Sequence, residues 1–421
     1  MKLDVYLFDK KCGELYSTSN NGVVFEYTKE YCEEQNNIPL SISLPIEKKT
    51  FTQKECIPYF FGLLPEGEIK QQIANELHIS ETSTLKLLEA LGGECAGTVS
   101  LFNSEEKYII PKSEYEFNDE NYQLISNKEI ADKILNCTKT PILFSDKEYR
   151  LSLAGAQQKI ALANFNGSWY IPKNGAPSTH IIKPSRKDYT DIGINEYFSM
   201  SIAKEFLRDV PKCNILNLKN DTDSFDVFCI ERYDRQIINK NESIKIKRIH
   251  QEDFCQALGI MSTNKYQNDG GPGIAQIINL IKNKSSQPVV DVQKTIEYFI
   301  FNFLIGNCDA HGKNYSLLWN NGIKLAPAYD IVSTVVYENL SRNLSMKIGG
   351  HYEIDKISKS HFIDTFEKCG INRRIINKTF EKFYSKIQNI NNVFSNTPIA
   401  QKYNLLLEKI IIQINKFIQE P

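Results

Sequence analysis

The hydrophobic pattern of this 421-residue chain changes character near its middle. Between about residues 149 and 235, apolar residues alternate or form short runs, as in KIALANF, GSWYIP, THIIKP and FDVFCIERYDR, and such runs indicate strands. Beyond residue 248 they recur at helical spacing, as in IAQIINLIK, VQKTIEYFIFNFLIG and NLLLEKIIIQINKFI. A β-rich half followed by a helical half is the order of a two-lobed phosphotransferase, so we predict a fold of that class.

The first hundred residues carry a separate pattern. Strand-like LDVYLFD and GVVFEY precede helical ECIPYFFGLLPEGEIKQQIANEL and STLKLLEALG, which indicates a small α+β unit. The polar segment 103–147 suits a connection that contains one short helix. We therefore predict an α+β protein with an N-terminal α+β subdomain over residues 1–105, a β-rich lobe over 106–240 and a helical lobe over 241–421.

Composition excludes several classes of function. Fifty basic residues against fifty-one acidic ones, without long runs of one sign, argue against a chain that holds nucleic acid by itself. Ten dispersed cysteines without a C-x-x-C pair favour reduced thiols over disulfides or structural zinc. The N-terminus lacks the features of a signal peptide, and the longest apolar run, residues 298–305, is too short to span a membrane. We expect a soluble, cytoplasmic protein without a membrane partner.

The stretch GNCDAHGKNYSLL, residues 306–318, packs polar residues directly after an apolar run. Asp309 and Asn314 have the Asp-x-x-x-x-Asn interval of a kinase catalytic loop, in which the carboxylate accepts a hydroxyl proton and the amide oxygen binds Mg²⁺. We count His311 and Lys313, which lie between them, with the catalytic residues. His311 has no Cys or His at ligand spacing, which favours a loop organiser over a zinc ligand. The bland alternative for the whole stretch is ordinary turn chemistry.

A hairpin pattern follows this stretch. YSLLW and IKLAPAYD read as two strands, and the Asn-Gly between them is a tight-turn signal. Because a hairpin folds back on itself, it returns Asp330 to the neighbourhood of Asn314. Two oxygen ligands for a hard cation would then flank Asp309.

Phosphate-binding candidates lie upstream. GLLPEGEIK is not a Walker A motif, because Glu68 stands where the lysine belongs. In LSLAGAQQKIALA, the small residues Ala154, Gly155 and Ala156 form a turn before a strand, and its backbone N–H groups can cradle phosphate. A plain β-turn is the alternative interpretation.

Two further positions are candidates for nucleotide contacts. Lys183 ends an apolar strand, and if it points inward it needs an anion, either nucleotide phosphates or Glu196 on the next helix; an outward-facing edge lysine is the alternative. The backbone from Glu231 to Tyr233 in FCIERYDR is placed to bond an adenine. Alternatively, its charged side chains form a solvated edge.

Taken together, these motifs resemble the HipA family of toxin serine/threonine kinases along nearly the whole chain. The motifs, in chain order, are GLLPEGEIKQ, GGECAGTVSL, LSLAGAQQKIAL, THIIKP, ERYDR, RIHQEDFCQALG, GNCDAHGKNYSLL and LAPAYDIVS. Eight ordered motifs are far more specific than any one of them.

The resemblance implies a role for each matching position. Asp309 would be the general base, Asn314 and Asp330 the Mg²⁺ ligands, and Lys183 a ligand of the ATP phosphates. The segment from Ser152 to Lys159, with Gln157 between them, would be the phosphate-binding loop. Ser152 matches the autophosphorylated serine, whose phosphorylation ejects the loop and switches the kinase off. Leu151 precedes it and no second serine lies nearby, so Ser152 is the residue available for this regulation.

The resemblance also implies cofactors and partners. ATP and Mg²⁺ would be the cofactors, and the protein substrate would be an aminoacyl-tRNA synthetase, of the glutamyl or the tryptophanyl type, whose phosphorylation on serine stops translation and growth. A helix-turn-helix antitoxin similar to HipB would neutralise the kinase, with DNA bound only through that antitoxin. A small-molecule phosphotransferase on the same fold and a non-catalytic antitoxin-binding protein are the alternatives.

Overall fold

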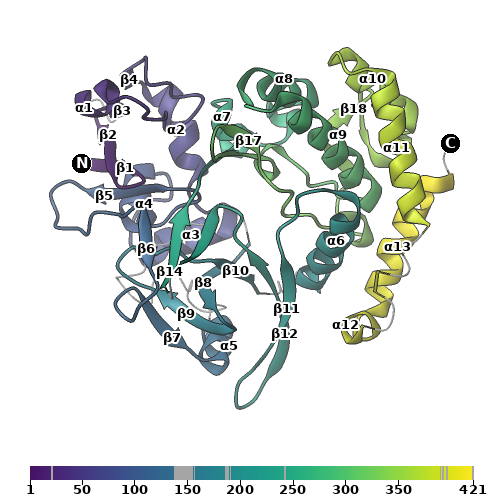
Figure 1. The fold of residues 1–421 in the computed structure, drawn as a ribbon, viewed down its shortest axis with the longest axis horizontal. Coiled ribbons are helices and arrows are strands. Elements are labelled where there is room, and N and C mark those ends of the chain that lie inside the picture. The colour runs from purple at the N-terminus through teal and green to yellow at the C-terminus, as the bar shows by residue number, and fades with distance from the viewer. Residues whose placement is uncertain are drawn as a thin grey trace. The chain divides into compact units, whose positions relative to one another are not determined.

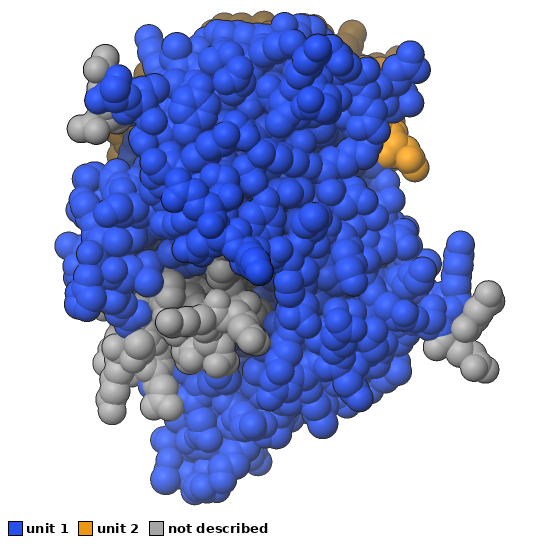
Figure 2. Space-filling model, turned by 90° about the vertical axis from the view of Figure 1, so that its left-hand side faces the viewer, with its two compact units in different colours: residues 1–184, 216–263, 318–320 blue, residues 185–215, 264–317, 321–421 orange. Residues whose placement is uncertain are grey.

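The chain folds into two compact units (Figure 2). Unit 1 comprises residues 1–184, 216–263 and 318–320, and unit 2 comprises residues 185–215, 264–317 and 321–421. The structure is a computed structural model that describes residues 1–19, 22–136, 155, 157–184, 189, 191–240, 243–388, 390, 393–394 and 397–419.

The N-terminal part of unit 1 is a five-stranded antiparallel sheet in the order β4-β3-β2-β1-β5 (Figure 1). The predicted strands and helices of this region are confirmed. Its strands are β1 (Lys2–Leu7), β2 (Lys10–Ser17), β3 (Val23–Tyr27), β4 (Thr50–Phe51) and β5 (Val99–Asn103), and its helices are α1 (Lys29–Glu33), α2 (Gln53–Gly62), α3 (Gly67–Glu76) and α4 (Thr84–Leu91). Buried side chains of α2, α3 and α4 pack with those of β1, β2 and β3 in one apolar core.

Two further sheets lie in unit 1. A six-stranded sheet has the order β11-β12-β10-β8-β9-β7, and a three-stranded sheet has the order β13-β14-β6. Helix α5 packs on the six-stranded sheet through Ile130 and Ile134. The elements are β6 (Glu114–Glu116), β7 (Tyr122–Ile125), α5 (Asn127–Asn136), β8 (Ile160–Phe165), β9 (Ser168–Pro172), β10 (His180–Lys183), β11 (Cys213–Lys219), β12 (Ser224–Glu231), β13 (Arg235–Lys240), β14 (Ser243–Arg248), β15 (His250–Asp253) and α7 (Phe254–Ala257).

Unit 2 is mainly helical, with α9 as its central helix. Phe301 of α9 meets Phe206 of α6, and Phe303 meets Phe417 of α13. The helices are α6 (Ile192–Phe206), α8 (Ile274–Lys284), α9 (Pro288–Ile305), α10 (Lys359–Lys368), α11 (Arg373–Ile387), α12 (Pro398–Lys402) and α13 (Asn404–Gln419). The strands are β17 (Ile323–Leu325), β18 (Asn343–Ile348) and β19 (His351–Glu353), and the 3₁₀ turns are η3 (Gln267–Asp269), η4 (Gly312–Asn314), η5 (Thr334–Val336) and η6 (Ile354–Lys356). Strand β16 (Ser316–Trp319) and turn η2 (Ser262–Asn264) each belong partly to unit 1 and partly to unit 2.

The predicted change from β-rich to helical structure is confirmed, with two differences in detail. The polar segment after residue 103 contains β6 and β7 as well as the expected short helix. QEDFCQALGI holds a strand and only one turn of helix, because β15 takes its first residues. The predicted domain boundaries at residues 105 and 240 divide the chain into three continuous segments. Each of the two compact units, in contrast, combines segments that are separate in the sequence. Accordingly, α6 falls in unit 2 while both of its neighbouring strands lie wholly or mostly in unit 1.

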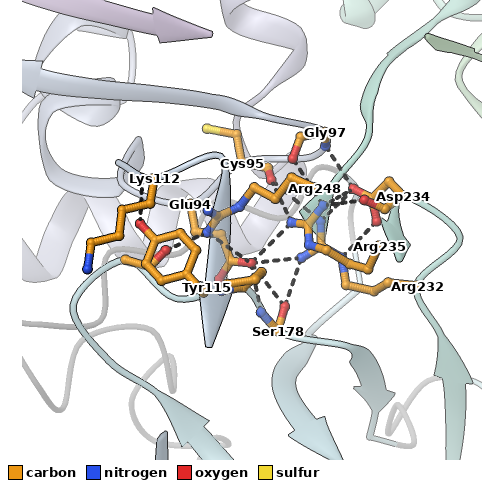
Figure 3. A network of polar contacts seen from close by, with 12 residues as sticks. Glu94, Cys95, Gly97, Lys112, Tyr115, Ser178, Arg232, Asp234, Arg235 and Arg248 are labelled. Atoms are coloured by element: carbon orange, nitrogen blue, oxygen red, sulfur yellow. Dashed lines mark hydrogen bonds and ion pairs between the residues drawn. The ribbon is translucent and has the colours of Figure 1, made fainter. Parts of the chain in front are cut away.

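A network of buried charges joins the N-terminal sheet of unit 1 to the rest of that unit (Figure 3). The Glu94 carboxylate lies 3.1 Å from Arg235, 3.4 Å from Arg232 and 3.9 Å from Arg248. Asp234 lies between Arg232 and Arg235 and accepts a hydrogen bond from the backbone N–H of Gly97 at 2.8 Å. Residues more than 130 positions apart in sequence are thereby held together.

The arginines keep both carboxylates of the network ionised. Burial alone would raise the pKa of Glu94, but Arg232, Arg248 and Arg235 together lower that pKa below its usual value. For Asp234, burial is likewise outweighed by Arg232 and Arg235, so its pKa is also lowered. Burial lowers the pKa of Arg235 to about 10, which still leaves this guanidinium charged near neutral pH.

We expect Glu94→Gln to lower the free energy of unfolding by about 3 kcal/mol, because it leaves buried guanidinium groups without a counter-charge. Urea denaturation followed by circular dichroism measures this loss. Glu34→Gln, which removes the exposed partner of Lys10, is the control and should change little. Equal effects of the two substitutions would contradict the structural role given to Glu94.

A second buried contact in unit 1 involves two titratable groups of β15. The His250 ring lies 3.0 Å from the carbonyl oxygen of Leu40, and the Glu252 carboxylate accepts the backbone N–H of Ile42 at 3.0 Å and the hydroxyl of Ser41. Burial lowers the pKa of His250 to about 4 and raises the pKa of Glu252 to about 7. Near neutral pH the histidine is therefore neutral, while the carboxyl group is close to its midpoint.

The raised pKa of Glu252 makes unfolding pH-dependent. Between pH 4.5 and about 7 the folded state holds a proton that the unfolded chain has released, so stability falls as pH rises through this window. The total is about 3 kcal/mol for a shift of this size. Glu252→Gln removes this titration, and its stability relative to the wild type should rise by that amount between pH 4.5 and 8. The midpoints of urea denaturation, measured across this pH range, give the difference in stability. The titration of His250 is common to both proteins, so it cancels in the difference. A difference in stability that does not change with pH would refute the raised pKa of Glu252.

Candidate active site

The predicted catalytic loop begins where α9 ends. Gly306 terminates the helix in the left-handed region, with φ of +73°. A side chain at this position would meet the Val335 methyl groups, because a Cβ there would lie 2.3 Å from Cγ2. Glycine is therefore required both by the backbone conformation and by the close approach of η5. The apolar run of α9 is thus the core helix that fixes the start of the polar loop.

Hydrogen bonds hold the loop on both sides of its peptide chain. Cys308 donates its N–H to Thr334 Oγ1 at 2.9 Å, and its carbonyl accepts the Ser345 hydroxyl at 2.8 Å. Asn307 accepts the N–H of Asp309 through its side-chain oxygen at 3.1 Å. These bonds use the backbone around Asp309 and leave its carboxylate exposed at the surface of the loop. An exposed carboxylate on a fixed backbone can meet a reacting hydroxyl.

The structure brings Asn314 and Asp330 together as predicted. The β16–β17 hairpin turns through Asn321 and Gly322, which have φ of +51° and +100°. After the hairpin, Asp330 Oδ2 lies 3.1 Å from Asn314 Nδ2. Asp330 itself has φ of +57°, a conformation that costs energy for most residues and is more tolerable for Asp. An amide and a carboxylate are thus placed side by side from segments sixteen residues apart.

His311 and Lys313 contribute first to the shape of the loop. The backbone N–H of His311 donates to the Asp309 carbonyl at 2.8 Å, and the Lys313 carbonyl accepts the Tyr329 hydroxyl at 2.6 Å. Both side chains are buried. Their assignment as catalytic residues stays a prediction.

Two residues that sequence reasoning missed support this site. Asn195 of α6 bonds both backbone groups of buried Ser333: its Nδ2 donates to the carbonyl at 3.0 Å and its Oδ1 accepts the N–H at 2.9 Å. Tyr266 donates its hydroxyl to Asp309 Oδ1 at 2.6 Å. An asparagine inside an apolar helix and a tyrosine ahead of a glycine-rich turn are weak signals, because the sequence does not show which backbone group each will meet.

In unit 1, Lys183 is buried at the end of β10. Strand β10 lies between β12 and β8, so Lys183 is not an edge lysine, and the side chain is only 5% exposed. Its ammonium lies 5.7 Å from the centre of the Phe228 ring. A buried ammonium favours anionic surroundings, which agrees with the inward-pointing interpretation.

Part of the predicted phosphate-binding loop lies close to Lys183. Gln157 Nε2 is 3.4 Å from the carbonyl of Pro184, which follows Lys183. Gly155 has φ of +112°, and a Cβ there would lie 2.7 Å from the Lys159 ammonium. The other predicted members of the loop, Ser152, Ala154 and Ala156, lie outside the described residues.

Gly155 also contacts the N-terminal part of unit 1. The backbone N–H of Glu66 donates to the Gly155 carbonyl at 3.1 Å, and Pro65 and Gly155 form a parallel bridge. The GLLPEGEIK stretch, which is no Walker motif, thus touches the predicted phosphate-binding loop through its backbone.

The ERYDR stretch has two faces. The Arg232 N–H donates to the Thr179 carbonyl at 2.8 Å, and the neighbouring residue Glu231 lies opposite His180 of β10. In an antiparallel pair, residues whose peptide groups bond the partner strand alternate with residues whose peptide groups point away from it. The peptide groups of Glu231 therefore face away from β10. The Tyr233 hydroxyl bonds Gln251. The alternative of a solvated edge is wrong for the charged residues that follow, because Arg232, Asp234 and Arg235 are buried in the network of Figure 3.

Comparison with known proteins identifies the family. Residues 3–102 match the model of the HipA N-terminal domain, and residues 151–390 match the model of the HipA-like C-terminal domain. The chain belongs to the HipA family of toxin kinases. The predicted kinase-like α+β fold class is confirmed by the same relationship and by the structural match below.

Individual HipA-family relatives cover most of the chain. A protein named putative kinase Y4mE, from Sinorhizobium fredii, is 32% identical over 89% of this chain and 87% of its own length. The serine/threonine-protein kinase toxin HipA of Shewanella oneidensis is 28% identical over 89% and 85%. The solved complex of Shewanella oneidensis HipA, HipB and operator DNA contains a chain with a TM-score of 0.82 and 25% identity, covering 99% of this chain and 98% of that one.

The donor set of the HipA-family site suits Mg²⁺. Within the described ranges, no group of three or more His, Cys, Asp and Glu side chains is arranged to hold a metal ion. Mg²⁺ does not require such a cage, because it keeps several waters and binds through one or two protein oxygens together with substrate phosphates. Asn314 and Asp330 each carry a side-chain oxygen and lie next to each other, which fits this mode of binding. Among the helices that the structure describes, none has the length and apolarity of a membrane span.

We expect Asn195→Ala to destabilise the segment after Asp330. It would leave the N–H and the carbonyl of Ser333 buried without their partner, at a cost of about 2–4 kcal/mol. Denaturation in urea measures the loss. The control is Asn283→Ala, since Asn283 is exposed and donates its side-chain hydrogen bond to Asn279 on the same helix. A similar loss there would refute the specific role of Asn195.

Proposed function

We propose that the protein is an ATP- and Mg²⁺-dependent serine/threonine-protein kinase that acts as the toxin of a toxin–antitoxin module. The observation that carries the proposal is the contact between Asn314 and Asp330, 3.1 Å apart, with the exposed base candidate Asp309 five residues before Asn314 in the chain. Asp309 and Asn314 have the interval of a kinase catalytic loop, the hairpin brings Asp330 to Asn314, and the chain belongs to a family of toxin kinases.

Each residue then has a defined part in phosphoryl transfer. Asp309 accepts the proton of the acceptor serine hydroxyl, whose oxygen bonds the γ-phosphorus of ATP as the bond to ADP breaks. Asn314 and Asp330 are the residues that would hold Mg²⁺, which supplies charge neutralisation at the phosphates. Lys183 contributes a buried positive charge for the phosphates, and the outward-facing peptide groups of Glu231 suit an adenine edge.

The loop from Ser152 to Lys159 would cover the phosphates and regulate the enzyme. Gly155 supports this role, since its positive φ suits a tight turn and the Lys159 ammonium places a positive charge close to its backbone. Autophosphorylation of Ser152 places a dianion next to the triphosphate, and repulsion then expels the loop. The kinase would switch itself off in this way.

The proposed target and partner rest on the resemblance to the HipA family. We propose that the substrate is a serine of an aminoacyl-tRNA synthetase, of the glutamyl or the tryptophanyl type, and that its phosphorylation arrests translation and growth. A helix-turn-helix protein similar to HipB would be the antitoxin, and DNA would be bound through it. The structurally similar HipA of Shewanella oneidensis was solved together with HipB and operator DNA, which supports this proposal.

Substitution of the acidic residues tests the proposal. Asp309→Asn and Asp330→Asn should each lower phosphate transfer by about a hundredfold or more, because one removes the base and the other a metal ligand, while thermal unfolding stays close to the wild type. Asp364→Asn, an exposed position on α10, is the control. Transfer is measured by incubating each purified protein with ATP, Mg²⁺ and host lysate and identifying new phosphosites by mass spectrometry.

The outcomes separate the alternatives. A new phosphoserine on one aminoacyl-tRNA synthetase, absent with Asp309→Asn, supports a toxin kinase and names its target. Phosphate transfer to metabolites without any protein phosphosite would favour a small-molecule phosphotransferase. No transfer at all would favour a non-catalytic antitoxin-binding protein, and near-normal activity of Asp330→Asn would overturn the metal assignment alone.

A further inference from the structure

We infer that Tyr266 positions the Asp309 carboxylate for proton transfer, a role that rests on the proposed kinase function. The Tyr266 hydroxyl donates to Asp309 Oδ1 across 2.6 Å. Asp309 is exposed, and an exposed carboxylate turns between rotamers unless a contact selects one. A hydrogen bond to an ionised acceptor is among the stronger ones, so this contact is able to select the rotamer.

Tyr266 is held firmly enough to do this. Its ring meets the His311 ring edge to face, with centroids 5.2 Å apart and an interplanar angle of 86°. The preceding carbonyl, of Lys265, accepts the N–H of Gly312 at 3.2 Å. The two-residue segment 265–266 therefore contacts the catalytic loop at three points, one of which is Asp309 itself.

The glycine-rich stretch after Tyr266 fixes this segment from behind. The N–H groups of Asp269 and Gly271 both donate to the Tyr266 carbonyl, at 3.0 and 2.8 Å. A Cβ at Gly271 would lie 2.3 Å from the carbonyl oxygen of Asn264, so the turn closes only with glycine there. NKYQNDGGPG contributes none of the proposed base, metal or nucleotide residues, and holding Tyr266 against Asp309 gives it a function.

The hydroxyl acts through the carboxylate and not on the substrate. In the transfer step the acceptor O–H proton moves to Asp309, the acceptor oxygen bonds the γ-phosphorus, and ADP leaves with the electrons of the broken P–O bond. With Tyr266 on Oδ1, the proton goes to Oδ2 in a fixed direction. Tyr266 keeps its own proton throughout, so it is a positioning residue.

Kinetics of Tyr266→Phe test the inference. The phenylalanine ring keeps the contact with His311 and loses only the hydroxyl, so kcat for protein phosphorylation should fall about tenfold while KM for ATP stays unchanged. In the Asp309→Asn background the same substitution should cause no further loss of the residual rate, because the two residues act as one unit. Tyr352→Phe is the control, a partly buried tyrosine of β19 in the same unit.

A crystal structure of Tyr266→Phe gives a readout that does not depend on activity. The Asp309 side chain should leave its wild-type rotamer or occupy more than one. An unchanged kcat, or equal losses in the wild-type and Asp309→Asn backgrounds, would overturn the inference. If the wild type phosphorylates no protein, the proposed function fails. The positioning role of Tyr266 is then tested by the Asp309 rotamer alone, and a single unchanged conformer of Asp309 in Tyr266→Phe refutes that role.

Discussion

Unit 1 depends on buried positive charge that only its N-terminal segment neutralises fully. Arg232, Arg235 and Arg248 come from the middle of the chain, and Asp234 supplies one of the two carboxylates near them. The other belongs to Glu94, which approaches all three guanidinium groups. Because unpaired buried charge costs several kcal/mol, Glu94 stabilises the positions of the three arginines. The network thus holds the side chains of Arg232, Asp234 and Arg235, and with them the backbone of the ERYDR stretch, in place.

The site in unit 2 is built on a different principle, since backbone groups and neutral side chains do most of the positioning. Cys308 and Ser333 are held through their peptide groups by Thr334, Ser345 and Asn195. Neutral hydrogen bonds of this kind add no charge near the reacting centre.

Sequence reasoning predicted the parts of the site that follow from local rules. The apolar run of α9, the Asp309 to Asn314 interval and the Asn-Gly hairpin that returns Asp330 are all local patterns, and the fold contains them. Contacts between distant segments were not predictable in this way. Nothing in one sequence pairs Asn195 with a backbone segment 138 residues away, or Glu94 with three arginines, because these contacts depend on how helices and sheets pack. Tyr266 was missed for the same reason.

The placement of Glu94 has a consequence for how the polypeptide divides. A break between β5 and β6 would yield one fragment with Glu94 and another with the three arginines. Neither fragment would pair all of its own buried charges, because the counter-charges of Glu94 lie in the second fragment. Separating the fragments therefore means hydrating charged groups that are buried in the assembled unit. Such fragments would behave as two obligate subunits that exchange slowly. The contacts of Glu252 with Ser41 and Ile42 also join the two pieces, so the fragments would be held together at more than one buried polar site.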